Sequence, residues 1–283
     1  MKKFEDLVFS DSYMFSTILE NPKNLGIAKE IIELAINRKV KDLRVISTEK
    51  TIQNKYQGKV SVLDVLAEGS DEYFDVEMQL EHYSYFAKRT RMYHSNMDVK
   101  MIKEGTPYED LKESIVIFIC KQDYFGLGLP RYTFHNYCDE NKDLKLDEKR
   151  TTIFLNPKSK CSEAKLKGFL EFIDCNEATD TFSQLLKDTV EKTKEDEAVR
   201  KDYMLFKEFV REVNREENEK ENAKAREEGK SEGISIGLEQ GKLEGKVERE
   251  VEIAKQMLLE REPMEKIVRY TGLSKEDITN LIK

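Results

Sequence analysis

The stretch that decides the fold is Val60-Ser-Val-Leu-Asp64-Val-Leu-Ala67, which is followed after a short polar segment by Asp75-Val-Glu77-Met-Gln79. Both pieces have the apolar pattern of β-strands, and the polar segment between them predicts a turn. If this turn centres on residues 70 and 71, the residue numbers of each cross-strand pair sum to 141. Asp64 then lies opposite Glu77, with Cβ atoms about 4.5–5.5 Å apart. The sequence therefore predicts a hairpin that brings two carboxylates together.

Asp64 is the only charged residue in its apolar strand, and a charge in such a setting requires compensation. Strand alternation places Asp75, Glu77 and Gln79 on one face of the second strand. Two carboxylates this close repel each other unless one is protonated or a cation lies between them. A hard divalent cation such as Mg²⁺ meets the requirement. The alternative without a metal is an acidic hairpin face that points into solvent.

The arrangement of Asp64, Glu77 and Gln79 resembles that of the PD-(D/E)XK nucleases, in which a hairpin presents Asp and then (Asp/Glu)-x-Lys to a divalent metal. Gln79 stands where Lys is usual, which is typical of the recombination-promoting nuclease and transposase family (Rpn). Further segments that resemble this family are Phe9–Phe15, Lys88–Ser95, Ile115–Cys120, Arg131–Phe134 and the glycine-rich tail. The resemblance covers nearly the whole chain. It implies an α/β fold with a restriction-endonuclease-like core, a mixed sheet flanked by helices, and a mostly helical C-terminal extension.

The same resemblance implies a Mg²⁺- or Mn²⁺-dependent endonuclease that hydrolyses DNA phosphodiester bonds and promotes recombination or transposition. Asp64 and Glu77 are then the metal ligands, helped by the backbone carbonyl of Met78. Gln79 is expected to orient the attacking water or the scissile phosphate. Because glutamine is uncharged, it cannot supply the charge stabilisation that lysine gives. A nearby lysine or arginine is expected to replace it.

Lys88, Arg89 and Arg91 are the candidates for this cation and for contact with DNA phosphates. They follow the hairpin at the start of a helix predicted over residues 83–104, where apolar residues recur every four positions. A solvated helix face is the alternative explanation of the cluster. The local excess of positive charge stands out because the whole chain carries a net charge of −8, which argues against non-specific coating of nucleic acid.

The composition of the 283-residue chain excludes several other classes of protein. The four cysteines lack the C-x-x-C spacing of a zinc site, and no disulfide framework is expected. The sequence contains no Walker loop, dinucleotide fingerprint or histidine-based triad, which argues against an ATPase, a dehydrogenase or a serine hydrolase. No signal peptide and no apolar run of membrane-spanning length is found. We therefore expect a reduced, soluble, cytoplasmic protein that does not enter a membrane.

Hydrophobic periodicity divides the chain into three predicted parts. Residues 1–180 form the nuclease-like domain, in which the order helix, three strands, helix and strand is the core order of the nuclease fold. Within it, further elements are predicted as helices over 11–19 and 27–35 and as strands over 40–53, 114–120, 131–136 and 151–155. Residues 181–248 form a charged helical extension. Residues 249–283 form a small helix-turn-helix-like unit, with Gly272 as a C-cap and Ser274 and Asp277 as a capping box.

Five glycines recur every fourth residue in the extension, at positions 229, 233, 237, 241 and 245. Each glycine costs a helix about 1 kcal/mol relative to alanine, so a flexible linker is one interpretation. The other is a smooth helical seam that allows close approach of a second copy, which makes a homodimer through the C-terminal helical region. The terminal unit either contacts DNA or serves as a structural hairpin.

A second function class competes with the nuclease. In it, the chain is a catalytically weak or inactive nuclease-fold protein that acts as an oligomerising or interaction module through its tail. The presence of both Asp64 and Glu77 favours the nuclease, whereas Gln79 and the acidic net charge favour the interaction module.

Overall fold

The computed structural model describes residues 1–46, 65–80, 86–102 and 107–281 of the chain. These residues form two compact units, Met1–Val210 and Arg211–Lys283. The predicted division at residues 180 and 248 is not tested by these units, but the first unit reaches further along the chain than residue 180.

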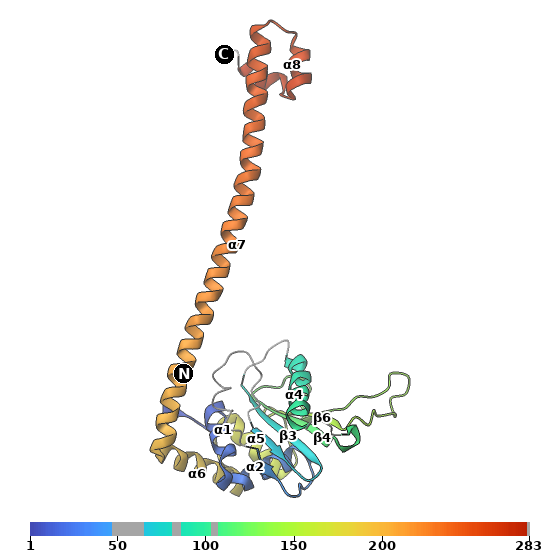
Figure 1. The fold of residues 1–283 in the computed structure, drawn as a ribbon, viewed down its shortest axis with the longest axis vertical. Coiled ribbons are helices and arrows are strands. Elements are labelled where there is room, and N and C mark those ends of the chain that lie inside the picture. The colour runs from blue at the N-terminus through green and yellow to red at the C-terminus, as the bar shows by residue number, and fades with distance from the viewer. Residues whose placement is uncertain (47–64, 81–85, 103–106, 282–283) are drawn as a thin grey trace. The chain divides into compact units, whose positions relative to one another are not determined.

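The first unit is built on a six-stranded mixed sheet (Figure 1). The strands β1, β2 and β3 pair in antiparallel order, β3, β4 and β6 pair in parallel, and β5 returns antiparallel to β6 at the edge. In sheet order their bounds are Arg44–Val45 (β1), Val65–Glu68 (β2), Glu72–Gln79 (β3), Glu113–Cys120 (β4), Arg150–Leu155 (β6) and Arg131–Phe134 (β5).

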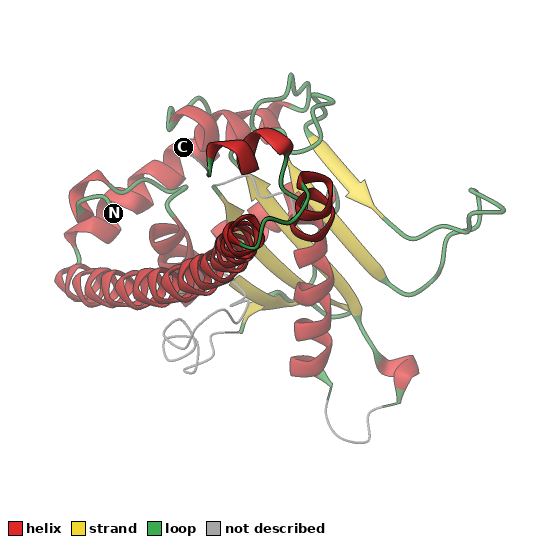
Figure 2. Ribbon diagram, turned by 90° about the horizontal axis from the view of Figure 1, so that it is seen from above, coloured by secondary structure: helices red, strands yellow, loops and turns green. Residues whose placement is uncertain are grey.

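Helices cover both faces of this sheet. One face carries α4 alone among the described helices, and Figure 2 shows α4 crossing the strands. The other face carries the larger core, to which α1, α2, α5, α6 and the first turns of α7 contribute side chains. The helices of this unit are α1 (Ser12–Glu20), α2 (Leu25–Ile36), α4 (Phe86–Met101), α5 (Ala164–Cys175) and α6 (Thr181–Glu195), with 3₁₀ turns at Phe4–Asp6, Pro22–Asn24 and Tyr108–Asp110. The predicted mixed sheet flanked by helices is confirmed.

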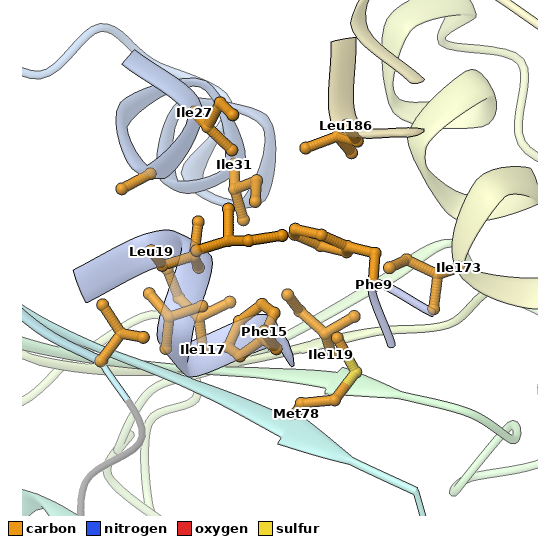
Figure 3. Packing of buried hydrophobic residues seen from close by; sticks show 14 of the residues in the cluster. Phe9, Phe15, Leu19, Ile27, Ile31, Met78, Ile117, Ile119, Ile173 and Leu186 are labelled. Carbon is orange, nitrogen blue, oxygen red and sulfur yellow. The ribbon is translucent and has the colours of Figure 1, made fainter. Parts of the chain in front are cut away.

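Strand β4 is buried on both faces, as its uninterrupted apolar sequence predicts. Ile117 and Ile119 point to the larger core, where they meet Phe15 of α1 and Met78 of β3 (Figure 3). The alternate residues of β4 belong to the smaller, aromatic-rich core under α4. In that core Phe118 stacks against Phe154, with ring centroids 5.1 Å apart. Cys120 is the last residue of β4, where it is buried, and burial raises the pKa of its thiol to about 12.

Some predicted elements differ from the observed ones in length. The helix predicted over 83–104 extends over Phe86–Met101, and its predicted start lies outside the described residues. Of the strand predicted over 40–53, the described residues 40–46 contain the two-residue strand β1, and the part from residue 47 onward lies outside the described residues. The strand predicted over 131–136 ends at Phe134, and a long loop then connects β5 to β6.

The glycine-rich segment lies within one helix, α7 (Glu197–Leu259), which is 63 residues long. A Cβ atom built at any of the five regularly spaced glycines would meet no atom within 4 Å. Side chains that extend from this helix include several exposed apolar ones, namely Ile234, Ile236, Leu238, Leu243 and Val247. The segment is therefore helical in the structure and leaves its glycine stripe open.

The C-terminal unit ends in α8 (Met264–Thr271) and α9 (Lys275–Asn280), which pack on the last turns of α7 around Ala254, Ile267 and Ile278. Gly272 caps α8 with a φ of 72°, and Ser274 and Asp277 form the capping box of α9. Both predicted caps are confirmed. Among the described residues, no helix combines the length and the apolar character that crossing a membrane requires.

Candidate active site

The carboxylates of β3 lie on the face of the sheet that α4 covers. Asp75 is fully buried and Glu77 is 5% exposed. Asp75 stands between Leu66 of β2 and Val116 of β4, and Glu77 is paired with Phe118 of β4. Strand alternation places the side chains of Asp75 and Glu77 on one face. Their neighbours on the adjacent strands are apolar residues of the smaller core. Such burial of carboxylates is costly unless other groups compensate for it, and it marks this end of the sheet as the candidate site.

The predicted register of the hairpin is observed wherever the structure describes it. Val65 pairs with Val76 and Glu68 pairs with Tyr73, so the residue numbers of each pair sum to 141. Asp64 itself lies outside the described residues. Its place opposite Glu77 stays a prediction.

Gln79 is the last residue of β3, and its side chain meets the first turn of α4. Arg89 donates a hydrogen bond from Nη1 to Oε1 of Gln79 across 3.2 Å. The same guanidinium donates to the hydroxyl of Tyr93 and lies over two rings, with its Cζ 5.3 Å from the centroid of Tyr93 and 5.9 Å from that of Phe86. A fixed positive charge thus contacts the residue that replaces the usual lysine.

The other two predicted DNA-binding residues lie elsewhere. Lys88 and Arg91 line a cavity of about 510 Å³ together with Arg150 of β6. Since β3 and β6 lie on opposite sides of β4 in the sheet, the flank of α4 that carries Lys88 and Arg91 is not the flank that carries Arg89. The structure therefore divides the basic cluster between two places.

A buried histidine anchors the middle of α4 to the sheet. The Nδ1 atom of His94 lies 2.6 Å from Oγ of Ser114, and its Nε2 atom lies 2.9 Å from Oγ1 of Thr152. Burial, assisted by the nearby positive charge of Arg150, lowers the pKa of His94 to about 3. His94 is therefore neutral at pH 7 and serves as a polar contact within the aromatic core.

Sequence reasoning assigned no role to Asp75 or Arg150. Asp75 could have been predicted as a site residue, because strand alternation places it on the same face as Glu77 and it has an apolar residue on each side in the sequence. Arg150 gives no comparable signal, since it follows a charged loop in the sequence. Its position near His94 and in the cavity depends on the pairing of β6 with β4.

The donor chemistry of β3 fits a hard divalent cation. Asp75 and Glu77 supply carboxylate oxygens, the ligands that Mg²⁺ and Mn²⁺ prefer. Within the part of the chain that the structure describes, no group of three or more histidine, cysteine or acidic side chains is positioned to hold a metal. A complete ligand set therefore requires a residue beyond these, and Asp64 is the predicted one.

Comparison with known proteins agrees with the geometry. The profile of the PD-(D/E)XK nuclease family transposases matches residues 6–235. No curated protein and no solved structure matches the chain significantly. The matched region includes the whole sheet, the buried carboxylates and most of α7. The chain belongs to the family of PD-(D/E)XK nuclease family transposases.

Proposed function

We propose that the protein is a metal-dependent endonuclease that hydrolyses phosphodiester bonds of DNA. The observation that carries this proposal is the pair of buried carboxylates, Asp75 and Glu77, on one face of β3 next to the contact between Gln79 and Arg89. Membership in a nuclease family supports the reaction class. Mg²⁺ is the proposed cofactor, with Mn²⁺ as a substitute, and DNA is the proposed substrate.

Asp64, Asp75 and Glu77 would hold the metal through their carboxylates, with the backbone carbonyl of Met78 as a further ligand. A bound divalent cation of this kind lowers the pKa of a water molecule and stabilises negative charge on the phosphate. Addition of Asp75 to the predicted pair follows from its full burial on the same face as Glu77. The surrounding apolar side chains keep bulk water away from the carboxylates, which strengthens their interaction with a cation.

Gln79 and Arg89 would act as one unit on the phosphate. The amide of Gln79 can orient the attacking water or a phosphate oxygen, and Arg89 supplies the positive charge that glutamine lacks. The rings of Phe86 and Tyr93 hold the guanidinium in place, so little conformational freedom is lost when a phosphate arrives. This pairing explains how a chain without the usual lysine can stabilise charge in the transition state.

Plasmid nicking tests the proposal directly. Wild-type protein and an Asp64→Ala variant purified in parallel are incubated with supercoiled DNA and Mg²⁺, and then with Mn²⁺. Cleavage that needs metal and is lost in the variant is the expected result. Equal cleavage by both proteins would refute the assignment of the site, and no cleavage by either on any DNA form would refute the nuclease.

We propose a role in recombination or transposition and a cytoplasmic location on the basis of family membership alone. We also propose that the chain forms a homodimer through α7. The exposed apolar side chains of that helix, among them Ile236 and Leu243, favour self-association because water excludes apolar surface of this kind. The same exposed helix supports the competing interpretation of an interaction module, in which the chain would associate without cleaving DNA.

A further inference from the structure

A groove separate from the carboxylates lies between α4 and the β5–β6 pair. It has a volume of about 510 Å³, which is within the usual range of roughly 300–1,000 Å³ for ligand pockets. The acidic residues of β3 do not line it. It is reached from the flank of α4 that carries Lys88 and Arg91, so a ligand bound there does not occupy the space between β3 and Arg89.

One wall of the groove is aromatic. Phe134 of β5 is 45% exposed although it is a large apolar residue. Its ring packs on Phe125, with centroids 5.0 Å apart, and edge-on to Phe154, with centroids 5.7 Å apart. Phe134 therefore offers a supported ring to the groove, on which a planar ligand can stack.

The opposite wall, formed by α4, is basic because it carries Lys88 and Arg91. Arg150 lines the groove from β6, and among the lining residues the single carboxylate is that of Glu148. The Glu148 side chain accepts a hydrogen bond from Nδ2 of Asn136. Three cations beside one acid form a local positive surface in a chain whose net charge is −8. Anionic ligands are therefore favoured at this wall.

The loop that carries Phe125 is held in one conformation by Asp123. The carboxylate of Asp123 accepts hydrogen bonds from the backbone N–H of Gly126 (3.0 Å) and Gly128 (2.7 Å) and from the hydroxyl of Tyr132 (2.8 Å). Both glycines have positive φ, 71° and 68°, where other residues are strained. The aromatic wall is thus formed before any ligand arrives, which lowers the entropic cost of binding.

We propose that this groove binds an unpaired nucleotide of DNA. The base stacks on Phe134, and the phosphate contacts Lys88 and Arg91. Stacking on an exposed ring next to cations is how proteins hold single-stranded nucleic acid, whereas bases within a duplex are stacked on each other and cannot reach such a ring. The inference rests on the proposed function because it takes DNA as the ligand. A base held in the groove would give the DNA strand a second point of attachment beside the cleavage site.

Fluorescence anisotropy of the full chain in EDTA tests the groove without cleavage. The probes are a labelled 12-nucleotide thymidine strand and a duplex of equal length, with thymidine monophosphate as competitor. We expect Phe134→Leu to weaken binding of the single strand about tenfold and to leave duplex binding within twofold. The double variant Lys88→Ala/Arg91→Ala should lower the salt slope of single-strand binding by about 0.7, the change expected when the contact with one phosphate is lost.

Matched controls are Tyr108→Leu, which removes another exposed ring, and Lys187→Ala/Lys201→Ala, which removes two exposed cations of α6 and α7. Both should bind the strand as wild type does. Unfolding temperatures of all variants show that they are folded. Displacement of the strand by the mononucleotide, with the same sensitivity to Phe134→Leu, would identify a free nucleotide as the occupant, and absence of displacement assigns the groove to a strand.

Single-strand affinity within twofold of wild type in both groove variants would overturn the proposal. Plasmid nicking reports on the proposed metal site, whereas this assay reports on the groove in the absence of metal. A protein that cleaves DNA without using the groove would pass the nicking test and fail the binding test. A protein that binds single strands in the groove without cleaving DNA would give the opposite pair of results.

Discussion

Arg89 of α4 and Gln79 of β3 are joined by a hydrogen bond of 3.2 Å from the guanidinium to the amide oxygen. The bond connects the crossover helix to the end of the strand that carries Asp75 and Glu77. It brings a positive charge into contact with Gln79.

Replacement of Arg89 should therefore impair cleavage. We expect Arg89→Gln to reduce the rate of plasmid nicking about a hundredfold, the effect of removing one donor that stabilises transition-state charge. Arg89→Lys should retain part of the rate, because it keeps the charge but not the planar fork that bonds both Gln79 and Tyr93. Arg226→Gln on the exposed part of α7 is the matched control. Wild-type rates for Arg89→Gln would show that the arginine has no part in the reaction.

Asp75 and Glu77 should report on metal binding independently of cleavage. A ligand that binds only the folded state at 100 times its Kd raises the free energy of unfolding by about 2.7 kcal/mol. We expect Mg²⁺ to raise the unfolding temperature of the wild type, and Asp75→Asn and Glu77→Gln to abolish this rise. Glu109→Gln, which neutralises an exposed carboxylate of the 3₁₀ turn before β4, should preserve it. If Mg²⁺ raises the unfolding temperature of all four proteins equally, the metal binds elsewhere.

His94 should make the fold sensitive to mild acid. Burial lowers its folded-state pKa to about 3, whereas the unfolded value is 6.5. Between these values the unfolded chain binds a proton that the folded chain does not, so the free energy of unfolding falls as the pH drops below 6.5. At 1.36 kcal/mol per pKa unit, His94 alone accounts for about 2 kcal/mol between pH 7 and pH 5.

Urea unfolding at pH 7 and pH 5 measures this contribution. His94→Gln is expected to be less stable than wild type at pH 7, because the contacts with Ser114 and Thr152 are altered. Its loss of stability on acidification should, however, be smaller than that of wild type by about 2 kcal/mol. His135→Gln leaves His94 in place and should keep the contribution of His94 to the pH dependence. An unchanged pH dependence in His94→Gln would mean that His94 takes up a proton as readily in the folded chain as in the unfolded chain.

The glycines of α7 can be tested by giving them a methyl group. In the isolated chain, Gly237→Ala and Gly241→Ala meet no atom within 4 Å and should each strengthen the helix by about 1 kcal/mol. If the glycine stripe is the seam of a homodimer, the same methyl groups hold two helices apart and weaken the dimer. We expect circular dichroism to show more helix and sedimentation to show a weaker dimer.

Ser235→Ala, on the same helix but outside the stripe, is the control for the sedimentation experiment. A chain that ends at residue 213 should sediment as a monomer. A dimer that is unchanged or tighter in the glycine variants would place the seam on another face of α7.

Sequence reasoning could predict what depends on local pattern. The apolar run of β4 predicts burial on both faces, and the turn after residue 68 predicts the pairing of Leu66 with Asp75. The capping box of Ser274 follows from the spacing of two residues. In each case the decisive residues are neighbours in the chain, and the backbone geometry of a strand, turn or helix end fixes their relation.

What could not be predicted depends on which helix flank meets which strand. Lys88, Arg89 and Arg91 lie within four residues, and their charges are equivalent in the sequence. Rotation of about 100° per residue along a helix sends Arg89 toward β3 and the other two toward β6. The packing of α4 on the sheet, through Phe86 and Tyr93 and through the contacts of His94, fixes that rotation. Helix propensity alone also does not decide whether the glycine segment is a linker or a helix, because it favours neither strongly enough.

The central position of β4 determines how the protein opens. Its backbone is hydrogen-bonded to β3 on one side and to β6 on the other, and its side chains are buried in both cores. The amide hydrogens of Ile117 and Phe118 can therefore meet solvent deuterium only when the whole sheet separates, and they should exchange last. Amides of the exposed part of α7 need only local fraying and should exchange early. A pulse of deuterated water read by mass spectrometry would thus show two populations of peptides, which lose their protons on different timescales.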